Sequence, residues 1–287
     1  MGSDVSIYLL GWLDDTSPPH TRPLPHTDLC IYNHTILGKG KCGTVVYAGL
    51  QPSTNKNVAI KVIQHTRTEE KENVVYEVEL LKELQSCKNI VQFLNVYEEK
   101  TFTQLVFEQC KWDLFHEIET SPNNCISEQN TKKIIKTVLD AIGFCHLRGI
   151  AHRDLKPENI LIRQTDGSAC LTDFGMSTRF TKFTRMYTRV GTSFYIAPEI
   201  VMHVNGYDER CDMWSIGVIT YCMLTGQPPF DGQTDKEVID KLINDDYDFS
   251  DTVRVSNDAQ EFIGCLMEKN VEFRKNAHEA LNHGFIK

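Results

Sequence analysis

The chain has 287 residues, 41% of them hydrophobic and 24% charged, a composition typical of a soluble globular protein with room for one large domain or two lobes. Its formal net charge of −9 argues against a general nucleic-acid-binding protein, which is usually basic, and favours partners that carry positive charge. The ten cysteines show no C-x-x-C pair and no zinc-finger spacing, so we expect a reducing, cytoplasmic environment. No apolar run approaches the length of a membrane span.

The first thirty residues read as an extension that precedes the folded domain. Gly2 and Ser6 fit a myristoylation signal, which would tether the chain to a membrane, but Met1-Gly2-Ser3 is also typical of a cloning remnant. The prolines at positions 18, 19, 23 and 25 cannot continue a helix, so we expect an extended linker over residues 1–29.

Three glycines in the run Gly38-Lys39-Gly40-Lys41-Cys42-Gly43 stand between two segments with strand composition. The second segment, Thr44–Tyr47, favours a strand, whereas a dinucleotide-binding fold requires a helix directly after the glycines. Glycine lets backbone N–H groups approach a phosphate without obstruction by Cβ, although a plain hairpin turn has the same pattern. We expect Cys42 at the tip of this turn, as an accessible thiol.

A lysine interrupts the apolar strand pattern of Val58–Val62, and the spacing of apolar residues predicts a helix over about 69–84. Glu77 falls on the apolar stripe of this helix, while Glu79 points away from it. A carboxylate on an apolar face is costly unless it is paired, so we expect Glu77 to pair with Lys61. The alternative is a lysine at a solvated edge and a glutamate at the margin of the stripe.

The middle of the chain predicts one more strand and a long helix. Gln104–Phe107 reads as a strand, and Glu108-Gln109-Cys110 follows it as a connection. Ser127 is a candidate N-cap for an amphipathic helix that ends near Gly149. The expected task of this helix is to support the segment that follows.

That segment, His152–Asn159, concentrates the chemistry of the chain. Asp154 supplies a carboxylate, Lys156 an amine and Asn159 an amide. Asp173, in Asp-Phe-Gly, adds a second carboxylate about a dozen residues later. Phosphoryl transfer requires this set of groups: one to orient a hydroxyl, one to neutralise phosphate charge, and oxygen ligands for Mg²⁺.

Taken in order, the glycine-rich turn, V-A-I-K, H-R-D-L-K-P-E-N and D-F-G resemble the motifs of eukaryotic protein kinases. Gly191–Phe230 and Ala280–Ile286 are most similar to the calcium/calmodulin-dependent group, especially the kinase module of calcium-dependent protein kinases. The resemblance implies an α+β, bilobal fold. Its expected parts are a small, mostly antiparallel β lobe with one key helix over about 30–107, a hinge over about 108–112, and a larger, mostly helical lobe over about 113–287.

The resemblance also implies a role for each matching residue. Asp154 would orient the substrate hydroxyl and accept its proton, and Lys156 would neutralise the transferring phosphate. Asn159 and Asp173 would hold Mg²⁺. The implied ATP-binding residues are Leu37, Gly38, Gly40, Gly43, Val45, Ala59, Lys61, Glu77, Phe107, Glu108, Cys110 and Leu161.

Other matching positions belong to the scaffold and to the activation loop. The scaffold positions are Arg153, Glu199, Asp212 and Arg274. Arg153 would pair with an activating phosphate on Thr188, for which the alternative is an unmodified surface threonine. Thr192 together with Lys156 resembles the pattern of Ser/Thr-specific enzymes.

The function that these residues favour is ATP- and Mg²⁺-dependent phosphorylation of Ser/Thr hydroxyls on protein substrates. Glu158 is a candidate contact for a basic residue near the acceptor, whereas Cys222 replaces a carboxylate that strongly basophilic relatives carry. One alternative stays open, a pseudokinase that acts as an ATP-binding or scaffolding module. A dinucleotide-dependent oxidoreductase is disfavoured, because a strand and not a helix follows the glycines.

Overall fold

The computed structural model describes residues 21–24, 27–40, 43–181, 183–188, 190–202, 206–249 and 255–287. These residues form two compact units. Of the described residues, the first unit contains those up to Glu79 and Gln92–Gln109, and the second contains those within Leu80–Val91 and Cys110–Lys287. Gly2 and Cys42 lie outside the described residues, so the membrane tether and the thiol at the turn tip stay predictions.

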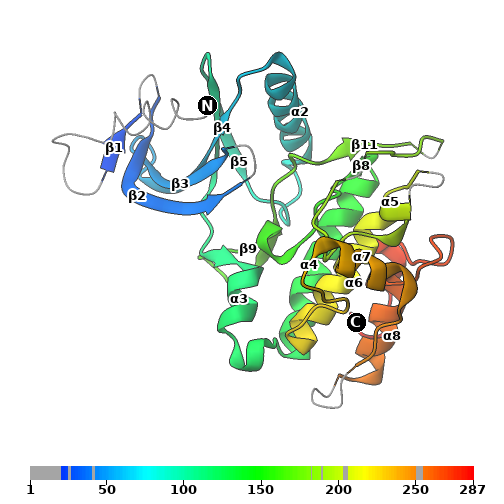
Figure 1. Cartoon of the computed structure of the whole chain (residues 1–287). Coiled ribbons are helices and arrows are strands. Elements are labelled where there is room, and N and C mark those ends of the chain that lie inside the picture. The colour runs from blue at the N-terminus through cyan, green and yellow to red at the C-terminus, as the bar shows by residue number, and fades with distance from the viewer. Residues whose placement is uncertain are drawn as a thin grey trace. The chain divides into compact units, whose positions relative to one another are not determined.

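The first unit is built on a six-stranded antiparallel sheet, which is curved (Figure 1). Its spatial order is β1-β2-β3-β4-β6-β5. The strands are β1 (Thr21–Pro23), β2 (Cys30–Lys39), β3 (Val45–Gln51), β4 (Lys56–Gln64), β5 (Phe93–Glu98) and β6 (Phe102–Glu108). Sequence alternation explains the core of this sheet, because Val58, Ile60 and Val62 point to one face and are almost fully buried.

The unit also contains the first part of helix α2 (Thr68–Leu84), which confirms the helix predicted over about 69–84. The helix continues past Glu79 into the second unit, so the first unit is not the single segment that the sequence suggested. The sheet likewise begins earlier than expected. Thr21–Pro23 pairs with β2 at a place where the prolines predicted an unpaired linker, and an edge strand tolerates Pro23 because one side of it needs no ladder hydrogen bonds.

The second unit is mostly helical. Its helices are α3 (Leu114–Thr120), α4 (Glu128–His146), α5 (Pro198–Met202), α6 (Arg210–Thr225), α7 (Asp235–Asn244), α8 (Asn257–Leu266) and α9 (Ala277–Leu281), with 3₁₀ turns η1 (Pro122–Asn124) and η2 (Pro157–Asn159). Short strands form two small sheets, β10-β9-β7 and β11-β8, from β7 (Trp112–Asp113), β8 (Ile150–Ala151), β9 (Ile160–Ile162), β10 (Ala169–Leu171) and β11 (Thr178–Arg179).

Helix α6 is the core of this unit, and Figure 1 shows it beside α4, against which it packs. Every residue from Cys211 to Leu224 is buried, as expected of a helix that is apolar all round. The helix ends at Gly226, whose φ of +74° and close approach to the carbonyl of Asn123 favour glycine. A residue with a β-carbon at position 226 would destabilise the C-terminal end of α6, the helix whose first turn carries Asp212.

Helix α4 begins as the sequence predicted. The Ser127 side chain accepts a hydrogen bond from the N–H of Asn130, which confirms it as the N-cap. The helix ends at His146, three residues before Gly149, where the chain turns with a φ of +67° into β8. The α+β class is thereby confirmed. Among the described residues, no helix is both long and apolar enough to span a bilayer.

Candidate active site

In the first unit, Lys61 on β4 and Glu77 on α2 form an ion pair with a separation of 2.7 Å between Nζ and Oε1. The side chains are 15% and 5% exposed, so the pair is largely shielded from water. The pairing predicted from the helical stripe is therefore present. A shielded ammonium held by a carboxylate is pre-oriented to meet phosphate oxygens.

The strand register decides which β3 residue shares a face with Lys61. Val46 lies directly opposite Lys61, whereas Val45 lies opposite Val62, which points into the core of the sheet. Side chains directly opposite one another project from the same face. In this register Val46, and not Val45, shares the sheet face of Lys61. The role of Val45 in nucleotide binding stays a prediction, and Val46 is the β3 residue that lies on the same face as Lys61.

The glycine-rich turn has the geometry that the glycines suggested. Gly40 donates its N–H to the carbonyl of Thr44 at 2.8 Å, and Gly43 has a φ of +76°. Gly38 lies within β2, with open space where a β-carbon would stand. Leu37 precedes it in the same strand and is exposed.

The predicted adenine-binding residues fall at the end of β6 and after it. Phe107 is buried, lies opposite Ala59, and packs its ring against Phe93 at 5.7 Å between centroids. The carboxylate of Glu108 accepts a hydrogen bond from the N–H of Gln92, so this side chain fixes the connection rather than pointing outward. In the second unit, Leu161 on β9 is half-buried and pairs with Cys170 on β10.

The second unit brings the catalytic candidates together around Asp154. One oxygen, Oδ2, lies 2.9 Å from Nζ of Lys156, and the other, Oδ1, accepts a hydrogen bond from Oγ1 of Thr192 at 3.1 Å. The side-chain amide of Asn159 donates to the backbone carbonyl of Asp154 at 2.7 Å. Asp154 is 9% exposed, and the contacts with Lys156 and Thr192 restrict rotation of its carboxylate.

Asn159 and Asp173 supply oxygen donors of the type that Mg²⁺ prefers. The Asn159 amide nitrogen is committed to Asp154, and this orientation leaves its oxygen as the atom suited to a metal. The backbone N–H of Thr172 donates to the carbonyl of Asn159, so Asp173 is placed next to it. Among the described residues, no three His, Cys, Asp or Glu side chains form a group that could hold a metal ion.

Asp212, at the start of α6, fixes the backbone that carries Asp154. Its two oxygens accept the N–H groups of His152 and Arg153 at 2.9 and 2.8 Å, and Nε2 of His146 lies 2.8 Å away. Burial alone would raise the pKa of Asp212, but the hydrogen bond from His146, the charge of the nearby histidines and the backbone donor of Arg153 together lower it. The group is therefore an anionic anchor inside the unit.

The guanidinium of Arg153, the residue predicted to answer an activating phosphate, is held by neutral groups. Its Nε donates to the carbonyl of Met176 at 2.8 Å, and a terminal nitrogen donates to the Tyr207 hydroxyl at 3.2 Å. Tyr207 in turn donates to the backbone carbonyl of Thr188 at 2.6 Å. The activation loop is thus linked to the catalytic loop through a tyrosine.

The Glu199–Arg274 pair is bidentate, with separations of 2.6 and 2.9 Å. Arg274 is 2% exposed, donates to the carbonyls of Glu268 and Arg210, and lies over the Trp214 ring. All its contacts are structural, as the resemblance implied for this position.

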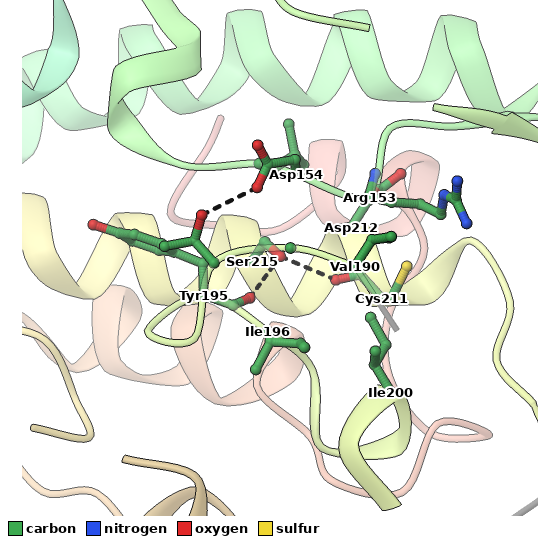
Figure 2. Close-up of a pocket in the computed structure, with 12 residues that line it drawn as sticks. Arg153, Asp154, Val190, Tyr195, Ile196, Ile200, Cys211, Asp212 and Ser215 are labelled. Carbon is green, nitrogen blue, oxygen red and sulfur yellow. Dashed lines mark hydrogen bonds between the residues drawn. The ribbon is translucent and has the colours of Figure 1, made fainter. Parts of the chain in front are cut away.

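Figure 2 shows a small cavity next to the segment that carries Asp154, with Asp154, Tyr195 and Ser215 in its wall. Its volume is about 10 Å³, room for about one water molecule. The Ser215 hydroxyl donates to the Tyr195 carbonyl at 2.8 Å, and burial raises the pKa of Tyr195 well above its ordinary value, so the phenol stays neutral. The cavity is too small for a substrate.

Sequence reasoning missed several contributors to this site. His146 occupies the last turn of α4, where a cation favours the helix dipole, and this position was a usable signal. No local pattern indicated Tyr207 or Val46, because their roles depend on a long-range contact and on strand register.

Comparison with known proteins agrees with this arrangement. A family model described as protein kinase domain matches residues 32–286. The chain is 33% identical to calcium-dependent protein kinase 4 of Arabidopsis thaliana, over 93% of this chain and 55% of that protein. It is 36% identical to calcium-dependent protein kinase 5 of Plasmodium falciparum, over 88% of this chain and 44% of that protein.

A third relative matches along most of its own length. The chain is 36% identical to myosin light chain kinase A of Dictyostelium discoideum, over 88% of this chain and 86% of that protein. The chain spans about half the length of the two calcium-dependent kinases. The family match covers nearly all of the sequence. Within the first unit Lys61 pairs with Glu77, and within the second Lys156 pairs with Asp154. The chain therefore belongs to the protein kinase family.

Proposed function

We propose that the chain transfers the γ-phosphoryl group of ATP to serine or threonine hydroxyls of protein substrates, with Mg²⁺ as the metal. The observation that carries this proposal is the arrangement around Asp154, whose two oxygens contact Lys156 and Thr192 while its backbone carbonyl binds Asn159. This arrangement combines a proton acceptor, a cation and a metal ligand within hydrogen-bonding distance of one another.

In this proposal Asp154 orients the substrate hydroxyl and accepts its proton as the oxygen attacks. The hydrogen bond from Thr192 restricts rotation of the carboxylate, which keeps one oxygen toward the incoming hydroxyl. Lys156, whose amine lies 2.9 Å from Asp154 and 3.5 Å from Thr192, neutralises charge on the phosphoryl group during transfer.

Other residues position the nucleotide. Bound ATP supplies the phosphoryl group, and the divalent metal offsets its negative charge. The oxygen donors of Asn159 and Asp173 fit such a metal, and the shielded ammonium of Lys61 fits the α/β-phosphates. No pseudokinase role is favoured, because the pairs Lys61–Glu77 and Asp154–Lys156 are both formed.

The acceptor sequence is proposed to include a basic residue, read by one carboxylate. Glu158 is exposed, and its negative charge contributes to the raised pKa of both Tyr195 and Cys222, so the three groups lie near one another. Burial is the main cause that raises the pKa of Cys222 to about 12, so Cys222 is neutral and adds no second negative charge. A single carboxylate gives a moderate preference for basic substrates.

A radiolabel transfer assay tests the proposal. The wild-type chain, Asp154→Asn and the surface control Asp258→Asn, an exposed residue of α8, are each given γ-labelled ATP, Mg²⁺ and a degenerate Ser/Thr peptide library with Arg or Lys at varied positions. We expect Asp258→Asn to match wild type and Asp154→Asn to lose about 10²- to 10⁴-fold in turnover while it still binds ATP. Equal transfer by wild type and Asp154→Asn would falsify the assigned role, and absence of transfer by wild type would leave the pseudokinase alternative.

A further inference from the structure

The sulfur atoms of Cys110 and Cys170 lie 3.7 Å apart. Both residues belong to the second unit and are 60 positions apart in the chain. The separation is a van der Waals contact between thiols, since a disulfide has an S–S distance of about 2.05 Å. Closing the gap therefore needs an approach of about 1.7 Å, which side-chain rotation and a small backbone shift can supply.

The three-stranded sheet holds the two cysteines in place. Trp112 on β7 pairs with Ile162 on β9, and the N–H of Lys111 donates to the carbonyl of the same Ile162 at 2.8 Å, so Cys110 is anchored from its C-terminal side. Cys170 lies on β10 opposite Leu161 of β9. The strand pairing of this sheet therefore positions the backbones of both cysteines, and with them the two sulfur atoms.

The two thiols differ in their access to a small oxidant. Cys170 has no exposed surface, whereas Cys110 is half-buried. An oxidant can reach Cys110 first, and the sulfenic acid formed there would meet a second thiol already in contact with it. This is the arrangement of a reactive and a resolving cysteine.

We propose that Cys110 and Cys170 form a reversible disulfide when the protein meets hydrogen peroxide. In the first step peroxide oxidises the Cys110 thiol to a sulfenic acid and releases one water. In the second step the Cys170 sulfur attacks the Cys110 sulfur, the S–S bond forms, and a second water leaves. Two thiols are oxidised, one peroxide is reduced, and a dithiol reductant restores both thiols by exchange.

The position of this bond gives it a consequence for the nucleotide, which rests on the proposed kinase function. Cys170 shares a sheet face with Leu161. Cys110 is one of the ATP-binding residues that the kinase resemblance implies, and we propose that its backbone contacts adenine. Pulling the Cys110 sulfur toward β10 displaces that backbone. Because this displacement would break one hydrogen bond between the Cys110 backbone and adenine, we expect oxidation to weaken ATP binding by about tenfold.

Peptide mapping tests the disulfide without any need for kinase activity. The intact chain is treated with peroxide, its remaining thiols are alkylated, and it is digested with trypsin without reductant. We expect residues 101–111 linked to residues 164–179, at a mass two hydrogens below the sum of the free peptides. Oxidation of Met176 in the second peptide adds an oxygen and is separable by mass.

Three variants complete the test: Cys110→Ser, Cys170→Ala and the matched control Cys125→Ser. Cys125 is a half-buried thiol like Cys110, but its Sγ donates to the carbonyl of Asn123, and it contacts no sulfur among the described residues. The linked peptide should persist in Cys125→Ser and vanish in the other two, and only the chains that form it should show a dithiothreitol-reversible loss of ATP affinity. If Cys170→Ala does not fold, Cys110→Ser alone decides the outcome. No linked peptide in wild type, or an equal loss of ATP affinity in Cys110→Ser, overturns the proposal.

Discussion

Thr192 donates a hydrogen bond to Asp154 from Oγ1 to Oδ1 at 3.1 Å, and it does so across 38 residues of sequence. This contact joins the segment that precedes α5 to the group proposed to accept the substrate proton. Thr192→Val removes the donor but keeps the shape of the side chain, so we expect kcat to fall about 10- to 100-fold, the equivalent of one hydrogen bond to a charged group. Steady-state kinetics on the best peptide measures this, with Thr192→Ser as the control that keeps the hydroxyl. Full turnover by Thr192→Val would show that the bond only stabilises the fold.

The register of β3 against β4 makes a second prediction. Val46 shares a face with Lys61 and Val45 does not, so Val46→Ala should weaken ATP binding by about fivefold through lost apolar contact. Val45→Ala should leave the affinity for ATP close to that of wild type and lower thermal stability instead, because its side chain faces the core of the sheet. Isothermal titration and thermal unfolding of the two variants separate these effects. The opposite pattern would mean that β3 is shifted by one residue.

The third prediction concerns the ion pair between Lys61 and Glu77. Glu77→Gln removes one negative charge from the shielded Lys61 ammonium, so we expect a loss of about 2 kcal/mol in the free energy of unfolding and weaker ATP binding. Glu79→Gln is the matched control, since Glu79 is an exposed position of the same helix. Urea denaturation and nucleotide titration of both variants provide the comparison. Equal behaviour of the two variants would argue that the pair has no energetic role.

Asp212 predicts a dependence of stability on pH. Hydrogen bonds and nearby histidines outweigh its burial and lower its pKa, whereas in the unfolded chain the pKa is about 3.9. A lowered pKa in the folded state means that the stabilisation is complete above about pH 4 and is lost as pH falls through the folded value. Asp212→Asn cannot titrate and should be about 2 kcal/mol less stable at neutral pH, with the difference from wild type narrowing below about pH 4. Urea denaturation across this pH range measures it, and a difference that widened in acid would have the wrong sign.

The Glu199–Arg274 pair is suited to a double-mutant cycle. Arg274→Ala leaves the Glu199 carboxylate without its cation and leaves the carbonyls of Glu268 and Arg210 without this donor. We therefore expect a loss of about 3–5 kcal/mol in the free energy of unfolding. The double variant Glu199→Ala/Arg274→Ala should cost less than the sum of the single variants, because each single variant leaves an unpaired charge and the double variant leaves none. Additive losses in urea denaturation would indicate that the two residues act independently.

Local sequence information was sufficient for the elements whose pattern is periodic. Helix α2 and its buried Glu77 followed from apolar spacing, and the start of α4 followed from the capping residue Ser127. The motifs around Asp154 also determined the family, because each residue type in them has a distinct chemical task.

What could not be predicted depended on contacts between distant segments. Strand parity can change with a single additional residue in a loop, so the face of Val45 could not be read from the motif alone. The pairing of Thr21–Pro23 with β2 overrode the signal of the prolines, because an edge strand accepts them. The contact of Cys110 with Cys170 across 60 residues has no sequence signature at all.

Arg153 and Asp173 hold their backbones at φ values of +68° and +62°, where a residue with a β-carbon pays about 1–2 kcal/mol that glycine does not. Selection for heat resistance alone would thus reward glycine at either position. A glycine variant selected in this way would be more stable to heat but would lose the guanidinium of Arg153 or the carboxylate of Asp173. Directed evolution of this chain therefore needs an assay of phosphorylation beside the assay of thermal unfolding.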